Sequence, residues 1–141
     1  MKKDIADRLR GEYEYLFHDS MRDLPDGWIE PLVVMLEKMY RLSTVGPSNI
    51  MAPGIITWCQ LRVEVYQSSA MAFASPMMPA GKWHQERALA CVEALAEFCG
   101  QTQETCMTCG ADGHLRMRIL GSNKEGVYCD KHTPGSVADD A

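Results

Sequence analysis

The chain has 141 residues, of which 46% are hydrophobic and 23% are charged, and its formal net charge is −5. This length and composition are typical of a single soluble domain, which would bury about 68% of the surface that the unfolded chain exposes. The acidic balance excludes a global positive field of the kind that draws proteins to nucleic acid or anionic lipid.

Targeting and redox features predict a cytoplasmic protein. The first residues, Met1 to Arg8, lack the apolar stretch of a secretory signal, and no run approaches the roughly 18 apolar residues of a membrane span. Six cysteines lie at uneven spacing, at positions 59, 91, 99, 106, 109 and 129. Because disulfides are rare in the cytoplasm, we expect free thiols and metal ligands rather than three disulfide bonds.

The N-terminal part of the chain predicts two amphipathic helices. In residues 3–18, apolar side chains recur at helical spacing and charged residues lie between them. Residues 19–27 predict a turn, because they end in the sequence Pro-Asp-Gly. A second helix is expected over residues 28–42, with Pro31 in its first turn, where proline is tolerated.

The middle of the chain predicts one strand and then an irregular segment. Residues 55–66 alternate between apolar and polar side chains, which is typical of a strand with one buried face. Residues 67–81 are expected to be irregular, and their Met-rich part, residues 71–78, contains Met71, Phe73, Met77 and Met78. Two interpretations of this Met-rich segment stay open: an adaptable surface for a partner, or filling of the core beneath a loop.

A third helix and a hairpin are expected in the last third of the chain. The helix spans residues 82–99 and ends at Gly100, and its predicted inner face holds Trp83, Leu89, Val92, Leu95, Ala96 and Cys99. The hairpin has strands at 115–120 and 126–129, and a small, polar tail over 134–141 is predicted to be disordered. The expected core combines Leu9, Leu16, Trp28, Leu32, Leu36, Leu61, Val63, Val65, Leu89, Val92 and Leu95.

The most informative feature of the chain is a repeated spacing of metal-binding residues. Two residues separate Cys106 from Cys109, and the same spacing separates Cys129 from His132 after a spacer of hairpin length. This is the ligand pattern of a tetrahedral Cys3His zinc site, and four protein ligands leave no coordination position open. We therefore predict a structural zinc ion. Such binding contributes roughly 10–16 kcal/mol of apparent folding free energy in zinc peptides, so metal loss should unfold at least the last third of the chain.

Other interpretations of these residues stay open. Cys106 and Cys109 could form a redox pair, although thioredoxin-type motifs follow a strand and open a helix. His114 could replace His132 as the fourth ligand, because only four residues separate it from Cys109, which leaves it within workable reach of the metal. The remaining cysteines are interpreted as small buried hydrophobic residues: Cys59, Cys91 and Cys99.

Four segments, in this order, resemble an uncharacterised family of small proteins found in proteobacteria and their phages. They are Asp26-Gly27-Trp28 at a helix start, the strand Gln60–Tyr66 with Leu61-Arg62, the stretch Cys106–Gly113 with Arg116 beyond it, and Cys129–His132. The chain departs from the family pattern in having Cys59-Gln60 in place of Gly-Gly, Thr133 in place of alanine, and no tryptophan on the hairpin. The resemblance covers roughly residues 20–132. It implies the family's fold and a phage or prophage setting, and it implies no activity.

These observations predict an α+β fold with three helices, a small β-sheet and a C-terminal zinc-ribbon-like hairpin. Residues 1–133 are expected to form one domain, with the zinc-ribbon-like module at about residues 100–133. The expected function is that of a non-enzymatic zinc-binding protein that acts by protein–protein interaction with a host factor, as an inhibitor of a host or defence protein. The oligomeric state stays open.

Nucleic-acid binding by the hairpin is the alternative function. Four cations against three carboxylates give this region a local charge of +1, whereas phosphate contacts normally need a cluster of cations. The residues counted are Arg116, Arg118, Lys124 and Lys131 against Asp112, Glu125 and Asp130. An enzyme is not expected, because the chain has no Ser-His-Asp order, no phosphate-binding loop and no His-Glu-x-x-His motif.

Overall fold

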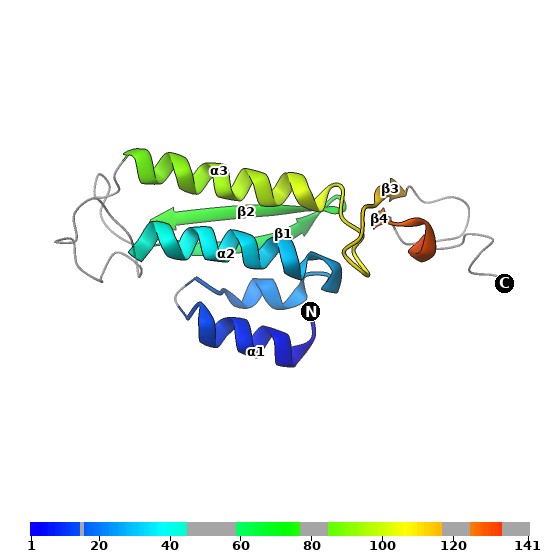
Figure 1. Cartoon of the computed structure of the whole chain (residues 1–141), viewed down its shortest axis with the longest axis horizontal. Coiled ribbons are helices and arrows are strands. Elements are labelled where there is room, and N and C mark those ends of the chain that lie inside the picture. The colour runs from blue at the N-terminus through cyan, green and yellow to red at the C-terminus, as the bar shows by residue number, and fades with distance from the viewer. Residues whose placement is uncertain (15, 45–58, 77–84, 117–124, 134–141) are drawn as a thin grey trace.

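The computed structural model of the chain describes residues 1–14, 16–44, 59–76, 85–116 and 125–133. These residues form an α+β fold, as predicted, with three α-helices and two separate antiparallel two-stranded sheets (Figure 1). The elements are α1 (Lys3–Glu12), η1 (Asp19–Asp23), η2 (Asp26–Trp28), α2 (Ile29–Thr44), β1 (Cys59–Tyr66), β2 (Ser69–Pro76), α3 (Gln85–Thr102), β3 (His114–Arg116), β4 (Gly126–Tyr128) and η4 (Asp130–His132), where η marks a short 3-10 helix. Within the described ranges, no helix combines the length and apolar character needed to cross a membrane.

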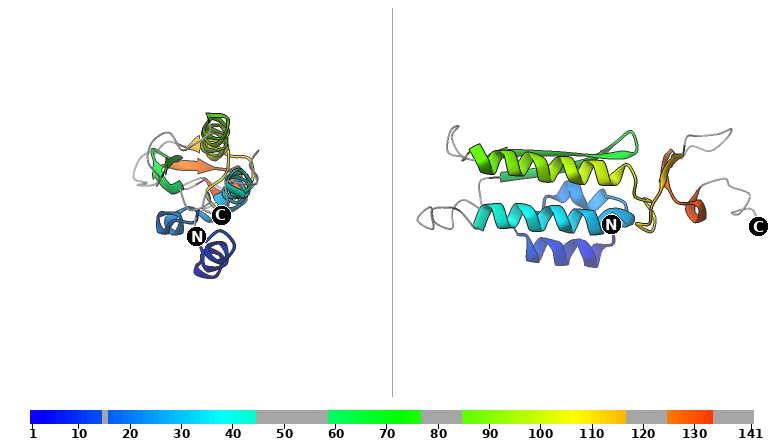
Figure 2. Two further views of the ribbon diagram at one scale, coloured as in Figure 1. Left: turned by 90° about the vertical axis from the view of Figure 1, so that its left-hand side faces the viewer. Right: turned by 45° about the horizontal axis from the view of Figure 1, so that its top comes forward.

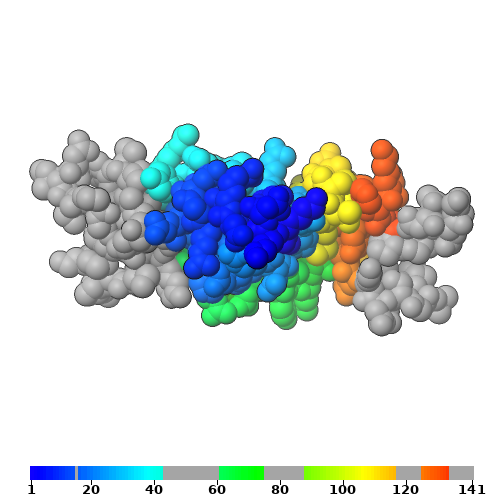
Figure 3. All heavy atoms as spheres, turned by 90° about the horizontal axis from the view of Figure 1, so that it is seen from below, coloured from blue at the N-terminus to red at the C-terminus, as the bar shows by residue number. Residues whose placement is uncertain are grey.

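The two sheets lie in different parts of the molecule. β1 and β2 run beside α2 and α3, whereas β3, β4 and η4 form a small unit beyond the C-terminal end of α3 (Figure 1). Viewed from one end, α2 lies between α1 and α3, and the β1–β2 hairpin lies to one side of the α2–α3 pair (Figure 2). From below, the N-terminal residues cover the middle of the body, and the C-terminal unit lies at one end (Figure 3).

The first helix is shorter than predicted. α1 ends at Glu12, so the predicted range of 3–18 is wrong at its C-terminal end. Tyr13 leaves the helical conformation, and the turn after it buries Leu16 against the core. The Tyr13 hydroxyl donates a hydrogen bond of 2.6 Å to Glu37 on α2. Burial and this hydrogen bond raise the pKa of Tyr13 to about 12, so the hydroxyl stays protonated and ties the end of α1 to α2.

The second helix follows the prediction closely. η2 contains the Asp-Gly-Trp sequence, and α2 continues from Ile29 to Thr44. Trp28, Leu32 and Leu36 are fully buried, as predicted from their helical spacing.

The segment that was predicted to be irregular forms a strand. β2 pairs with β1 along its whole length, from Cys59 opposite Pro76 to Tyr66 opposite Ser69. The sequence signal was an alternation of alanine with larger residues in β2, which is weak because alanine has little preference for strands. This pairing places Met71 and Phe73 on the outer face of the hairpin, where they are 40% and 47% exposed. Core filling is therefore excluded for these two residues; Met77 and Met78 lie outside the described residues.

The turn between β1 and β2 carries backbone strain. Gln67 and Ser68 have φ angles of 48° and 68°, a left-handed conformation that glycine and asparagine adopt more readily. Replacing Ser68 by glycine is expected to raise the free energy of unfolding by about 1 kcal/mol, because a left-handed residue with a Cβ costs roughly that much. Urea denaturation would measure the change. Ser69→Gly, at a strand position beside the turn, is the control and should destabilise the protein; an equal gain in both variants would contradict the explanation.

Neighbouring elements close both edges of the β1–β2 hairpin. The Val63 amide donates to Ser20 Oγ of η1 at 3.2 Å, and the Ala70 amide donates to Thr102 Oγ1 of α3 at 3.0 Å. The Ala72 amide donates to the Cys99 thiol. Burial raises the pKa of Cys99, and this effect is larger than the lowering that the hydrogen bond causes. These side chains satisfy amides that would otherwise be free to pair with a further strand.

The third helix buries a different face from the predicted one. It runs to Thr102, two residues beyond the predicted stop at Gly100. Its inner face is formed by Cys91, Ala94, Leu95, Phe98 and Thr102, which are all buried. Leu89 and Val92 are 59% and 61% exposed, so their predicted core positions are wrong. The helix has apolar residues on several faces, and only its packing against α2 and β2 selects one of them.

The remaining core predictions were mostly correct. Val65 is an exception at 43% exposure, although Ala70, its partner on β2, is buried. At this end of the hairpin, the inner layer therefore covers β2 and leaves β1 partly exposed. Ala96 is exposed as well, and Trp83 lies outside the described residues. The predicted residues that are buried are Leu9, Leu16, Trp28, Leu32, Leu36, Leu61, Val63 and Leu95.

Candidate metal centre

The first ligand pair lies on a tight backbone turn that follows α3. The Cys106 amide donates to Ala111 O at 2.7 Å, and the Gly110 amide donates to Cys106 O at 3.0 Å. Gly110 has a φ of +81°, which a residue with a Cβ rarely adopts. This turn presents Cys106 and Cys109 on the same side, as the two-residue spacing predicts.

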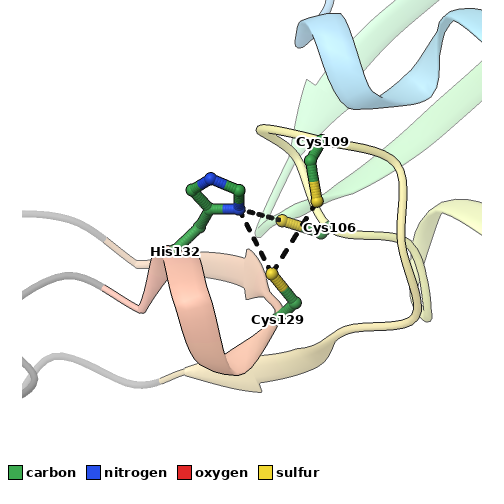
Figure 4. A group of neighbouring side chains, drawn as sticks. All are labelled: Cys106, Cys109, Cys129 and His132. Atoms are coloured by element: carbon green, nitrogen blue, oxygen red, sulfur yellow. Dashed lines mark hydrogen bonds between the residues drawn. The ribbon is translucent and has the colours of Figure 1, made fainter. Parts of the chain in front are cut away.

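The C-terminal hairpin brings the second ligand pair to this turn. β3 and β4 are antiparallel, with His114 opposite Tyr128 and Arg116 opposite Gly126. The Met107 amide donates to Val127 O of β4 at 2.9 Å, which attaches the first turn to the hairpin. Cys129 follows β4 directly, and η4 turns the chain so that Nδ1 of His132 faces the sulfur atoms of Cys106 and Cys129 (Figure 4).

Three sulfurs and one imidazole nitrogen converge in this arrangement. Each of Cys106, Cys109, Cys129 and His132 offers one ligand atom, and these atoms all lie within 4.8 Å of one another. Cys109 Sγ is 3.7 Å from Cys129 Sγ, and His132 Nδ1 is 3.2 Å from Cys129 Sγ and 3.8 Å from Cys106 Sγ. In a tetrahedron with metal–sulfur bonds of about 2.3 Å, sulfur atoms lie about 3.8 Å apart. The four groups are therefore placed closely enough to hold a metal ion.

Backbone amides favour the thiolate form of the innermost ligand. Cys106 is fully buried, and burial raises the pKa of its thiol. Amides of Cys129, Cys109 and Thr108 donate to Cys106 Sγ and outweigh that effect, so the pKa of Cys106 falls to about 6. The Ala111 amide acts in the same direction on the pKa of Cys109, but burial and the neighbouring sulfurs of Cys106 and Cys129 raise that pKa overall. Mutual repulsion among thiolates is what a bound cation would relieve.

The Asp-Gly-Trp turn packs directly against the first ligand turn. The Gly27 amide donates to Met107 O at 2.9 Å, and Trp28 Nε1 donates to Thr105 O at 3.3 Å. A Cβ on Gly27 would lie 1.9 Å from the Cys106 carbonyl oxygen and 2.8 Å from the Gly110 nitrogen. This contact attaches the ligand cluster to the start of α2. The sequence resemblance indicated these residues as a helix start, but nothing in their spacing predicted that they contact the ligand turn.

A concavity of about 440 Å³ lies beside the ligand cluster. It is lined by Cys109, Ala111, Asp112, His114, Cys129, Asp130, Lys131 and His132. Cys109 is exposed, so the cluster is sealed on the Cys106 side and open to solvent on this side. Arg116 donates to Asp130 at 2.8 Å across the hairpin.

The structure distinguishes between the two candidate histidines. His114 is exposed on β3 and lines the concavity, but it does not belong to the cluster whose ligand atoms lie within 4.8 Å. His132 does belong to it. Of the other cysteines, Cys91 is buried and Cys99 half-buried, whereas the side chain of Cys59 lies outside the described residues. The Cys106–Cys109 turn follows a helix and precedes a hairpin, unlike a thioredoxin-type redox motif.

Comparison with known proteins adds no relative. No family model matches the chain, and neither curated proteins nor solved structures give a significant match.

Proposed function

We propose that Cys106, Cys109, Cys129 and His132 bind one structural zinc ion. Three thiolates and an imidazole are a donor set that zinc prefers, and their separations suit its tetrahedral coordination. With four protein ligands, no position is left for a substrate, so the ion would stabilise the fold rather than act in catalysis. It would hold the first ligand turn against the β3–β4 hairpin, to which the hydrogen bond from the Met107 amide to Val127 O also connects it.

We propose further that this protein binds a host protein through the surface around the proposed zinc site, which the ligand turn, the β3–β4 hairpin and η4 form. The observation that carries this proposal is the concavity beside the cluster, because its walls are exposed side chains on backbone that the metal would fix in place. Leu115 follows His114 on β3 and is 52% exposed. It is not among the residues that line the concavity, but it adds an exposed apolar side chain to the same hairpin. The resemblance to proteobacterial and phage proteins supports a phage or prophage origin, in which inhibition of a host or defence protein is the expected role.

Nucleic-acid binding is supported less well. Among the described cations of the hairpin, Arg116 pairs with Asp130, so its charge is already compensated. Lys131 is exposed beside the same carboxylate, and Arg118 and Lys124 lie outside the described residues. A binding site for phosphates needs a cluster of uncompensated cations.

A capture experiment with a matched control tests the host-protein proposal. The tagged, zinc-loaded protein is used to capture proteins from a bacterial lysate, in parallel with the triple variant His114→Ala/Leu115→Ser/Lys131→Ala. None of these residues is a proposed zinc ligand, so zinc content should stay unchanged. We expect a specific partner to bind the wild type and to lose at least about tenfold in affinity with the variant.

The control variant Leu89→Ser/Val92→Ser removes two exposed apolar side chains of α3 and should keep the partner. The partner is then purified and its binding is measured by calorimetry. The proposal fails if the triple variant binds as well as the wild type, or if only the α3 variant loses binding.

A further inference from the structure

The outer face of the β1–β2 hairpin combines apolar and charged side chains that no described element covers. By register, Arg62 lies opposite Phe73, Glu64 opposite Met71, and Tyr66 opposite Ser69, so these residues share one face. Phe73, Met71 and Tyr66 are 47%, 40% and 57% exposed. The opposite face carries Leu61 and Val63, which are fully buried. An exposed face of this kind on a two-stranded sheet indicates an interaction surface.

Both edges of the hairpin are partly occupied by contacts with neighbouring elements. The Val63 amide already donates to Ser20 on one edge, and the Ala70 amide donates to Thr102 on the other. These contacts protect the edges in the middle of β1 and at the start of β2. A partner would therefore pack against the face of the sheet instead of extending it.

The charges on this face are balanced, in contrast to those of the whole chain. Arg62 and Glu64 form an ion pair of 2.5 Å, with side chains 55% and 49% exposed. The outer face therefore has no net charge, whereas the chain carries −5. Neither an acidic nor a basic partner would be attracted to it, but a surface with one charge of each sign can complement itself.

We propose that this outer face, formed by Arg62, Glu64, Tyr66, Met71 and Phe73, docks a second copy of this chain. The two hairpins pack face to face about a two-fold axis perpendicular to the strands, so that β1 of each copy runs antiparallel to β1 of the other. Arg62 of each copy then faces Glu64 of the second copy, and the four charges form one network. In the other two-fold arrangement, the strands of the two copies run in the same direction. Arg62 would then lie at the same height along the strands as Arg62 of the second copy, and Glu64 at the same height as Glu64, which brings like charges closer together. Met71, Phe73 and Tyr66 supply the apolar contact around this network.

The expected dimer is weak and depends on concentration. A two-stranded face offers less than the roughly 800 Å² per partner that stable complexes bury, so we expect a Kd on the order of 10–100 μM. Sedimentation equilibrium of the full zinc-loaded chain, from about 5 to 500 μM, should show a mass that rises from the 15.8 kDa of the monomer towards twice that value. A mass that stays at the monomer value at the highest concentration would overturn the proposal.

Exchanging the two charges tests the proposed arrangement of the two copies. Arg62→Glu and Glu64→Arg should each weaken self-association about tenfold, because like charges then meet across the two-fold axis. The double variant Arg62→Glu/Glu64→Arg carries the same charges in exchanged positions and should restore self-association to within about threefold of the wild type. Loss in the double variant as large as in either single variant would overturn the proposal, because the exchanged charges should complement each other across the two-fold axis as the original ones do.

Two further variants test the apolar part of the face. Met71→Ser/Phe73→Ser should abolish self-association over the same concentration range. Val34→Ser removes an apolar side chain of similar exposure, 41%, from α2 and should leave it unchanged. Circular dichroism checks that each variant is folded. If the double serine variant is not folded, the charge variants alone test the proposed interface. Self-association that survives the folded double serine variant would place the interface elsewhere and overturn the proposal.

Discussion

Replacing Cys106 by serine is expected to release the metal ion and to unfold the C-terminal unit of the chain. Serine oxygen is a poor zinc ligand, and Cys106 is the buried member of the cluster, held by three amide donors that point at its sulfur. Metal binding contributes roughly 10–16 kcal/mol of apparent folding free energy in zinc peptides, which is comparable to the total stability of many domains. The β3–β4 sheet has three residue pairs and cannot stay folded without this contribution.

Hydrogen exchange and elemental analysis measure the effect. We expect about one zinc per wild-type chain and less than about 0.1 in Cys106→Ser. Amide protection should be lost over residues 105–133, a shorter range than the last third of the chain that the sequence led us to expect. It should be retained in α2, β1, β2 and α3, because the buried residues of these elements form a core cluster that does not include Cys106. Removal of zinc from the wild type by a chelator should give the same pattern.

The matched control is Cys99→Ser. Cys99 lies on α3 outside the ligand cluster, and serine can still accept the hydrogen bond from the Ala72 amide. This variant should keep its zinc and its exchange pattern. The structural role of the metal would be refuted if pure, reduced wild-type protein without zinc were still folded over its whole length and unfolded in one cooperative transition.

Replacing Gly27 by alanine is expected to destabilise the protein by roughly 3 kcal/mol or more. The added Cβ would lie 1.9 Å from the Cys106 carbonyl oxygen and 2.8 Å from backbone atoms of Met107 and Gly110. All of these are backbone atoms, so the overlap can be relieved only if the ligand turn and α2 move apart. The hydrogen bond from the Gly27 amide to Met107 O would then be lost as well.

Denaturation by urea would measure the loss of stability, and competition with a chelator would measure zinc affinity. Both should fall, because zinc binding and docking of the ligand turn are linked. The control is Gly100→Ala, at an exposed position of α3 where a Cβ meets no atom within 4 Å. Alanine there should increase stability by about 0.5–1 kcal/mol, since glycine is unfavourable inside a helix. A Gly27→Ala variant as stable as the wild type would show that η2 does not pack against the ligand turn as described.

The sequence predicted the elements with strong local signals and missed those without them. The helical spacing of Trp28, Leu32 and Leu36 correctly identified the buried face of α2. The boundary of α1 was wrong because it depends on the burial of Leu16 in a turn, a tertiary effect. β2 was missed because alanine carries little strand preference, and its pairing with β1 supplies the stabilisation that its own residues do not.

The ligand cluster shows the same division. The spacing of Cys106, Cys109 and Cys129 is a local property, so the sequence alone indicated these three as ligands of one metal ion. It left His114 and His132 open as the fourth ligand, and the structure places His132 in the cluster. The sequence also determined the α+β class, because hydrophobic period and turn residues act over a few positions. Only the tertiary structure decided which face of α3 is buried, that Met71 and Phe73 are exposed, and that Gly27 contacts the ligand turn. Those outcomes depend on contacts between residues far apart in the chain, whose geometry no local pattern contains.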